Sequence, residues 1–190
     1  MKWINFLLIA IMAMASCTGA NGSNNAAQQP QEQNATDTQN KQTEQYISQR
    51  LTEIYNEALK EEGHDLLALD HKFMSQEYND LQDKAMKIAE RNEDLVIDSD
   101  HWVQGQDWTY PTMDIVSIED ITPTTALARV KIVTHMPGAD NVTTLLILPL
   151  VFERGDWYID NMQQYYEGEL LDEKAWYNKY VDNDGTMGED

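Results

Sequence analysis

The chain contains a single cysteine and few basic side chains, and each shortage excludes a class of protein. Because Cys17 is alone, no disulfide can form within the chain. Lysine and arginine number 13 against 33 aspartates and glutamates, which gives a net charge of −20. Proteins that bind nucleic acids need a basic surface, so we expect no nucleic-acid partner. The same charge disfavours flat docking onto anionic lipid.

Motifs that identify catalysis or metal binding from spacing alone are also absent. The sequence has no Gly-x-Ser-x-Gly nucleophile elbow and no phosphate-binding glycine loop. Its histidines lack the spacing of a zinc site. They stand at His64, His71, His101 and His135. The sequence therefore predicts no cofactor, with calcium as the one alternative.

Long apolar runs are missing except at the N-terminus. Lys2 is followed by an apolar run from Phe6 to Ala15. At about ten residues this run is too short to span roughly 30 Å of hydrocarbon, which argues against a transmembrane anchor. A basic start, an apolar run and then small residues are typical of a secretory signal peptide. We expect residues 1–16 to be that signal.

The signal ends in Met14-Ala15-Ser16-Cys17, which resembles a bacterial lipobox. The resemblance implies cleavage before Cys17 and acylation of the new N-terminal cysteine, palmitate included. The chain would then be exported and anchored to a membrane by lipid. Met14 departs from the usual leucine at its position. The alternative is an ordinary signal peptide that is cleaved nearby and leaves Cys17 unmodified.

Residues 17–42 are predicted to form a flexible tether. From Thr18 to Gln42 there is no valine, isoleucine, leucine or aromatic residue to bury. About 25 such residues reach 25–30 Å on average and about 85 Å when extended. Many Bacteroidota-type lipoproteins that reach the cell surface carry acidic residues just after the cysteine. Thr18 to Asn21 contains none, which favours an outer-membrane lipoprotein facing the periplasm.

Residues 43–181 have the length of one domain, and their first half is helical in pattern. Apolar residues at helical spacing predict a helix over 47–59 that ends near Gly63. A short helical turn is expected around 66–69. Ser75 is a typical N-cap for a further helix over 78–89.

The second half of the domain alternates with a period of two. This pattern predicts strands, at 114–121, 125–135, 142–153 and 157–162. Pro149 indicates a bulge or an edge within the third. A last helix is expected over 170–180, and an acidic, disordered tail over 182–190. Helices followed by antiparallel strands define an α+β fold.

Two short motifs and a closing strand carry a resemblance to a known family. Asp98-Ser99-Asp100 and Gln106-Asp107 follow the helices, and Gly155-Asp156-Trp157-Tyr158-Ile159-Asp160-Asn161 closes the strands. This order resembles a bacterial family of uncharacterised lipoproteins over residues 44–165. The resemblance implies a nuclear transport factor 2-like, cystatin-like cone, in which N-terminal helices pack on a curved antiparallel sheet of three to four strands.

The loop between the helices and the strands is the densest polar and aromatic stretch. In a cone it would lie near the open mouth, where it would line a ligand pocket together with the closing strand. The candidate residues are Asp98, Asp100, His101, Trp102, Gln106, Asp107, Trp108, Tyr110, Trp157 and Asp160. In the alternative interpretation the aromatic side chains fill the cone and the aspartates cap turns.

Two kinds of chemistry would use these carboxylates. Asp100 with His101, or Asp107 with Asp160, could divide the acid and base roles of an isomerase, dehydratase or hydrolase. Asp98, Asp100 and Asp107 could instead hold calcium. The acidic tail at 182–185 superficially resembles a calcium loop.

A cluster of aromatic residues follows the last predicted strand, at Tyr165, Tyr166, Trp176, Tyr177 and Tyr180. It would either pack a terminal helix or form a surface for a protein partner. A homodimer through this region or through the sheet face is also expected of a cone fold. The sequence thus favours a non-catalytic module that binds a ligand or a partner, with a small-molecule enzyme and an accessory subunit of an envelope complex as alternatives.

Overall fold

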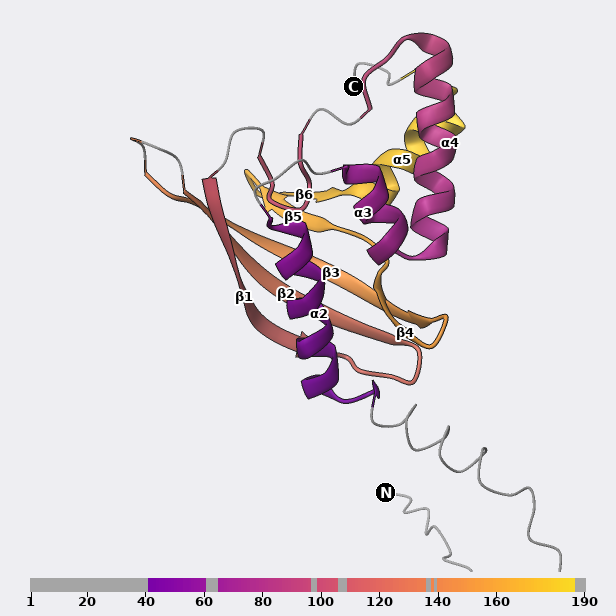
Figure 1. Ribbon diagram of the computed structural model, residues 1–190. Coiled ribbons are helices and arrows are strands. Elements are labelled where there is room, and N and C mark those ends of the chain that lie inside the picture. Colours follow the sequence, from indigo (N-terminus) through magenta and orange to yellow (C-terminus); the bar gives the residue numbers. More distant parts are fainter. Residues whose placement is uncertain are drawn as a thin grey trace, which may run out of the picture.

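The computed structural model describes residues 41–60, 65–96, 99–105, 109–135, 138 and 140–186 (Figure 1). The predicted signal peptide, Cys17 and residues 17–40 of the tether lie outside this range. So do four residues of the candidate pocket, Asp98, Gln106, Asp107 and Trp108. Of Tyr110 only the backbone is described.

Each described helix begins at a side chain that accepts a hydrogen bond from its first turn, which satisfies an otherwise unpaired amide. The helices are α2 (Glu44–Ala58), α3 (Leu66–Phe73), α4 (Gln76–Asn92) and α5 (Glu173–Asp182). Their N-caps are Thr43, Asp65, Ser75 and Asp172. The predicted cap at Ser75 is confirmed, since its hydroxyl accepts from the Tyr78 amide at 3.1 Å.

The strands form one antiparallel sheet of six strands in the order β1-β2-β3-β5-β6, with β4 paired to β3 outside this path. Their bounds are β1 (Thr109–Glu119), β2 (Thr125–His135), β3 (Val142–Glu153), β4 (Asp156–Ile159), β5 (Gln163–Tyr166) and β6 (Glu169–Asp172). The α+β class is therefore confirmed. The predicted count of three to four strands is wrong, because β5 and β6 are too short to show a period of two.

The last helix begins later than the sequence predicts. The predicted helix over 170–180 includes Leu170 and Leu171, but these two residues belong to β6, and α5 begins only at Glu173. The turn that separates β5 from β6 is Glu167-Gly168, whose φ angles are 51° and 90°. Positive φ at both central residues is typical of a type I′ hairpin turn. The Glu-Gly pair is a weaker sequence signal for this turn than Asn-Gly.

On the side of β3 that faces away from β2, the paired strand changes at Pro149. Leu150 pairs with Ile159 of β4, whereas Ile147 pairs with Gln163 of β5. The Pro149 carbonyl accepts a hydrogen bond from the Asp160 amide at 2.8 Å. A proline, which has no amide hydrogen, fits this irregular position better than a regular one.

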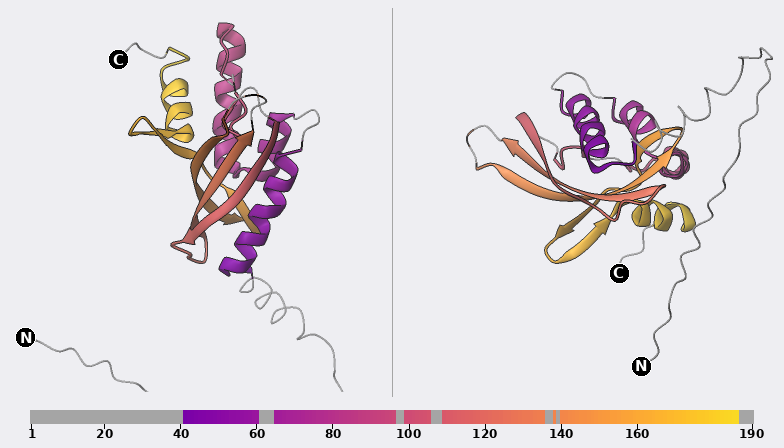
Figure 2. Two further views of the ribbon diagram at one scale, coloured as in Figure 1. Left: turned by 90° about the vertical axis from the view of Figure 1, so that its left-hand side faces the viewer. Right: turned by 90° about the horizontal axis from the view of Figure 1, so that it is seen from below.

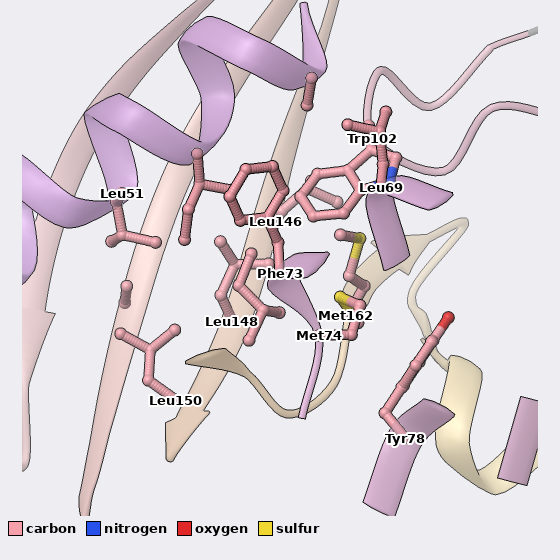
Figure 3. Close-up of a cluster of buried hydrophobic side chains, with 14 of the residues drawn as sticks. Leu51, Leu69, Phe73, Met74, Tyr78, Trp102, Leu146, Leu148, Leu150 and Met162 are labelled. Atoms are coloured by element: carbon pink, nitrogen blue, oxygen red, sulfur yellow. The ribbon is translucent and has the colours of Figure 1, made fainter. Parts of the chain in front are cut away.

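The core lies between the concave face of the sheet and helices α2 and α3 (Figure 2). Trp102 and Trp157 are 0% and 1% exposed. The Trp102 ring packs edge-to-face with Tyr55 and Phe73, at centroid distances of 5.8 and 6.3 Å. Figure 3 shows Phe73 among the β3 leucines Leu146, Leu148 and Leu150, with Trp102, Met74 and Met162 beside them. Helices α4 and α5 pack on each other at one end of the sheet.

Both ends of the described chain are held against the domain. The Trp157 indole donates to the Lys41 carbonyl at 2.6 Å, and the Lys41 ammonium donates to the Gly155 carbonyl at 2.9 Å. The chain therefore enters beside the β3–β4 turn. Residues 182–190 were expected to be a disordered tail; within them, the Gly185 amide donates to the Tyr180 carbonyl and Asp184 pairs with Arg91.

Candidate functional site

A small closed loop carries two of the predicted pocket residues into the interior. The Asp100 and Gly105 backbones exchange hydrogen bonds of 3.1 and 3.2 Å, which close the loop. The Asp100 carboxylate accepts from the Trp102 amide at 2.9 Å, as in an Asx turn. This geometry buries His101 and Trp102. Asp100 thus does what the alternative interpretation expected of it, which is to cap a turn.

The partner of both buried rings is Asp70, a fully buried residue of α3. One carboxylate oxygen accepts from His101 Nε2 at 2.8 Å and from Trp102 Nε1 at 2.9 Å. The other oxygen accepts from Gln82 Nε2 of α4 at 2.7 Å. A buried carboxylate needs such compensation, because burial without partners costs several kcal/mol.

On its other side, His101 approaches a second carboxylate. His101 Nδ1 lies 3.5 Å from Glu173 Oε2, at the start of α5. The same oxygen accepts a hydrogen bond from the Tyr78 hydroxyl at 2.7 Å. Gln82 also donates to the Tyr177 hydroxyl at 3.3 Å. We call this set the buried polar cluster; its members are Asp70, Tyr78, Gln82, His101, Trp102, Glu173 and Tyr177.

The charges in the buried polar cluster follow from this geometry. Burial opposes protonation of His101, but the carboxylates of Glu173 and Asp70 outweigh it and raise the pKa of His101 to about 9. Burial likewise raises the pKa of Glu173 against the pull of the imidazolium. Burial raises the pKa of Tyr177 to about 12. At neutral pH, His101 is therefore a cation held between Asp70 and Glu173. The phenols of Tyr78 and Tyr177 keep their protons.

This arrangement leaves His101 little room for acid–base catalysis. Both of its ring nitrogens face carboxylates, so a general base role would require a partner to leave. Glu173 is the more accessible acid, with 26% of its side chain exposed. Chemically, the cluster ties α3, α4, the 99–105 loop and α5 together through charge-assisted hydrogen bonds.

The candidate pocket residues whose side chains the structure describes are divided among the closed loop, the core and the start of α4. Asp100, His101 and Trp102 lie in the closed loop, and Trp157 lies in the core. Asp160 instead accepts from Ser75 Oγ at 2.7 Å and pairs with Lys174 at 3.1 Å. Because Asp107 lies outside the described residues, its pairing with Asp160 stays a prediction.

Sequence reasoning missed the residues that His101 meets. Asp70 and Gln82 stand on the apolar stripes of α3 and α4, among Leu69, Phe73 and Ala85. A polar residue within an apolar stripe is the signal that could have found them. Glu173 was not recognised as a site residue because the predicted helix over 170–180 places it inside the helix and not at its first position.

Four exposed large apolar side chains lie on the β5–β6 hairpin, residues 163–172. Tyr165 and Tyr166 are 66% and 61% exposed, and Leu170 and Leu171 are 46% and 45% exposed. Tyr165 pairs with Leu170 across the strands. Because side chains alternate, this pair occupies one face of the hairpin, and Tyr166 and Leu171 occupy the other. In Figure 2 the hairpin extends beyond the sheet.

The aromatic cluster predicted over 165–180 divides between core and surface. Tyr177 and Tyr180 are buried against α4, where the Tyr180 hydroxyl donates to Asp94 at 2.9 Å. Tyr165, Tyr166 and Trp176 are exposed. Both predicted roles therefore have residues in place, and the exposed set is concentrated on the hairpin.

The hairpin is held at the base of both of its strands, and through β5 it is linked to the loop that carries His101. Gln164 of β5 donates to Gln104, which itself donates to the His101 carbonyl at 2.6 Å. At the end of β6, Asp172 accepts from the Asn161 side chain at 2.9 Å and from the Ala175 amide at 2.8 Å. These contacts fix the hairpin at its base.

The central strands β1, β2 and β3 also expose side chains, and these are of mixed kind. Lys131 pairs with Asp114 at 2.7 Å, and Arg129 lies 3.5 Å from Glu119. Val116 and Leu145 of the same strands are 56% and 47% exposed. The sheet predicted for homodimerisation thus exposes both ion pairs and single apolar side chains.

The described residues contain neither a helix suited to span a membrane nor a cluster of side chains suited to hold a metal. No helix there is both long and apolar enough to cross a bilayer. No group of three or more histidine, cysteine, aspartate or glutamate side chains there is arranged to hold a metal ion. Asp98 and Asp107 of the proposed calcium site lie outside this part of the chain.

Comparison with known proteins identifies no relative. No protein-family model, curated protein or solved structure matches the chain.

Proposed function

We propose that this chain is an acylated lipoprotein of the cell envelope whose α+β domain binds a protein partner without catalysis. The observation that carries the proposal is the exposure of Tyr165, Tyr166, Leu170 and Leu171 on one hairpin. Large exposed apolar groups that lie side by side typically mark interaction sites, and interface cores are rich in aromatic residues.

A partner protein fits these observations better than a small ligand. Trp102 and Trp157 occupy the core, and the Asp100 carboxylate caps a turn. A small-molecule site usually combines a concave apolar lining with a few convergent polar groups. The polar groups nearest to the predicted mouth are instead bonded to one another in the buried polar cluster.

The anchor in this proposal is the lipid on Cys17. The net charge of −20 works against adhesion to anionic lipid, so the acyl chains would hold the protein at the membrane. The predicted tether ends where Lys41 is held beside the β3–β4 turn. An outer-membrane position facing the periplasm is part of the same proposal.

We also infer that the domain is a nuclear transport factor 2-like cone. The curved sheet with helices α2 and α3 on its concave side supports this finer assignment (Figure 2). The β5–β6 hairpin and α5 would then be an addition beyond the pattern that the resemblance covers.

One observation favours the alternative of a small-molecule enzyme. Glu173 combines a raised pKa with a partly exposed carboxyl group, beside a protonated His101. Such an acid could protonate a leaving group. We place this alternative second because the carboxyl oxygen near His101 already accepts the Tyr78 hydroxyl.

Variants of the hairpin test the proposed function. The double variant Tyr165→Ser with Leu170→Ser removes one apolar face without touching the core. The matched control is Leu95→Ser, which removes an isolated apolar side chain that is 77% exposed. After crosslinking in intact cells and affinity isolation of the full chain, we expect a discrete adduct with the wild type and the control. Retention of that adduct by the double variant would refute the proposal.

A further inference from the structure

We infer that the β5–β6 hairpin binds an extended, basic segment of its partner by strand addition along β6. This inference rests on the proposed function and specifies the kind of partner.

The first support is the free edge of β6. In the sheet order β1-β2-β3-β5-β6, strand β6 is last, and within the described residues only β5 pairs with it. Tyr166 and Glu169 flank a two-residue turn. In such hairpins the pair that flanks the turn exchanges backbone hydrogen bonds, and the next pair, here Tyr165 and Leu170, does not. The backbone amide and carbonyl of Leu170 therefore point to the free edge. A free edge is a template for another strand.

The second support is the pattern of side chains that flank this edge. A strand laid against β6 would place alternate residues beside Leu170 on one face and beside Leu171 on the other. Tyr165 lies directly behind Leu170, so the added strand would extend an existing apolar row. The edge therefore favours a segment that carries apolar side chains on both faces.

The third support is charge. Between Gln163 and Leu171 the chain contains no lysine or arginine, and its two charged residues, Glu167 and Glu169, are both exposed. A second copy of the same hairpin would bring like charges together, in a chain whose net charge is −20. A segment with lysine or arginine beside its apolar residues would meet complementary charge instead. We therefore assign the edge to a basic partner and not to a homodimer.

The hairpin is also organised before binding. The type I′ turn matches the twist of its strands, and Asp172 caps α5 at the other end. A rigid edge loses little conformational freedom when a partner strand is added.

The test uses the full chain, purified from membranes in detergent, and a displayed library of random nine-residue peptides. We expect enrichment of peptides in which lysine or arginine accompanies apolar residues at alternating positions. Synthetic copies should bind more weakly as salt is raised. Leu170→Pro and Leu170→Ala both remove the leucine side chain, but only Leu170→Pro also removes the amide that faces the free edge. Leu170→Pro should therefore weaken binding by about tenfold or more relative to Leu170→Ala.

Peptide chemistry provides a second readout that does not depend on the folding of a variant. N-methylation of alternate peptide amides should abolish binding in one register and leave it intact in the other. Enrichment of non-basic peptides, no enrichment at all, or indifference to both Leu170→Pro and N-methylation would overturn the inference.

The two proposals fail in different ways. If the hairpin variants lose their adduct in cells but no basic peptide is enriched, partner binding stands and strand addition is wrong. If basic peptides bind β6 but the hairpin variants keep the adduct, the edge is real and the proposed function is wrong.

Discussion

Asp70 and His101 lie 31 residues apart in the sequence and are joined by a hydrogen bond of 2.8 Å between a carboxylate and an imidazole, both buried. Glu173, at the start of α5, completes the arrangement from the opposite side of the ring. One cation thus neutralises two acids that come from different helices. The base of the β5–β6 hairpin is bonded to the same loop through Gln104. The buried charge therefore holds the element that we propose to meet a partner.

Removal of the cation should be costly. We expect His101→Gln to lower the free energy of unfolding by about 3–5 kcal/mol, because the buried carboxylate of Asp70 and the half-buried carboxylate of Glu173 would lose their counter-charge. The control is His71→Gln, since His71 pairs with Asp83 on the surface and should contribute close to nothing. Urea unfolding of the two variants provides the comparison. Equal stabilities would show that the charge on His101 is not structural.

Stability should decline as the solution becomes alkaline. The pKa of His101 rises from its ordinary value of 6.5 to about 9 on folding, so the folded state binds the proton more tightly than the unfolded state does. This contribution is fully present below pH 6.5 and is lost as the pH approaches 9. Urea unfolding at pH 6.5 and pH 9 should show a loss of a few kcal/mol that His101→Gln abolishes.

The hydroxyl of Tyr78 should lower the pKa of Glu173. Burial raises this pKa, and the hydrogen bond from Tyr78 opposes that rise. Tyr78→Phe should therefore raise the pKa of Glu173 further and cost about 1–2 kcal/mol of stability. Carbon-detected NMR titration of the Glu173 carboxyl measures the first effect.

Tyr55→Phe is the matched control, because the Tyr55 hydroxyl is buried and has no hydrogen-bond partner within the described residues. Its loss should leave stability unchanged or slightly raised, and should not move the titration of Glu173. Identical behaviour of the two variants would contradict the role assigned to Tyr78.

Cys17→Ser should release the protein from membranes. Thioether and amide acylation both require the cysteine, so the variant should take up no labelled palmitate and should fractionate with soluble proteins. Incorporation of palmitate by the serine variant would show that the anchor is elsewhere. If the wild type itself takes up no label, the ordinary signal-peptide alternative is correct.

Local signals predicted most of the elements well. Ser75 caps α4 as expected, and strands β2 and β3 match the predicted bounds of 125–135 and 142–153. These elements have long periodic patterns, and the period itself indicates which of their side chains are buried. By contrast, β5 and β6 have four residues each, and both of their faces are exposed. Periodicity carries no information about such strands.

The site was predictable only in part. The sequence singled out His101 and Trp102 because they stand in a polar, aromatic loop. Their partner Asp70 is determined by tertiary contacts between α3 and a loop beyond α4, which no local pattern encodes. The exposure of Tyr165 and the burial of Tyr177 also depend on where α5 packs.

The most direct test of the account is site-specific photo-crosslinking in living cells. A benzophenone amino acid would replace Tyr165 on the hairpin and, separately, Leu95, which is exposed on the loop that follows α4. Partner binding by the hairpin predicts one discrete adduct at position 165, lost when Leu170→Pro is added, and none at position 95. The same adducts at both positions, or none at position 165, would contradict the account.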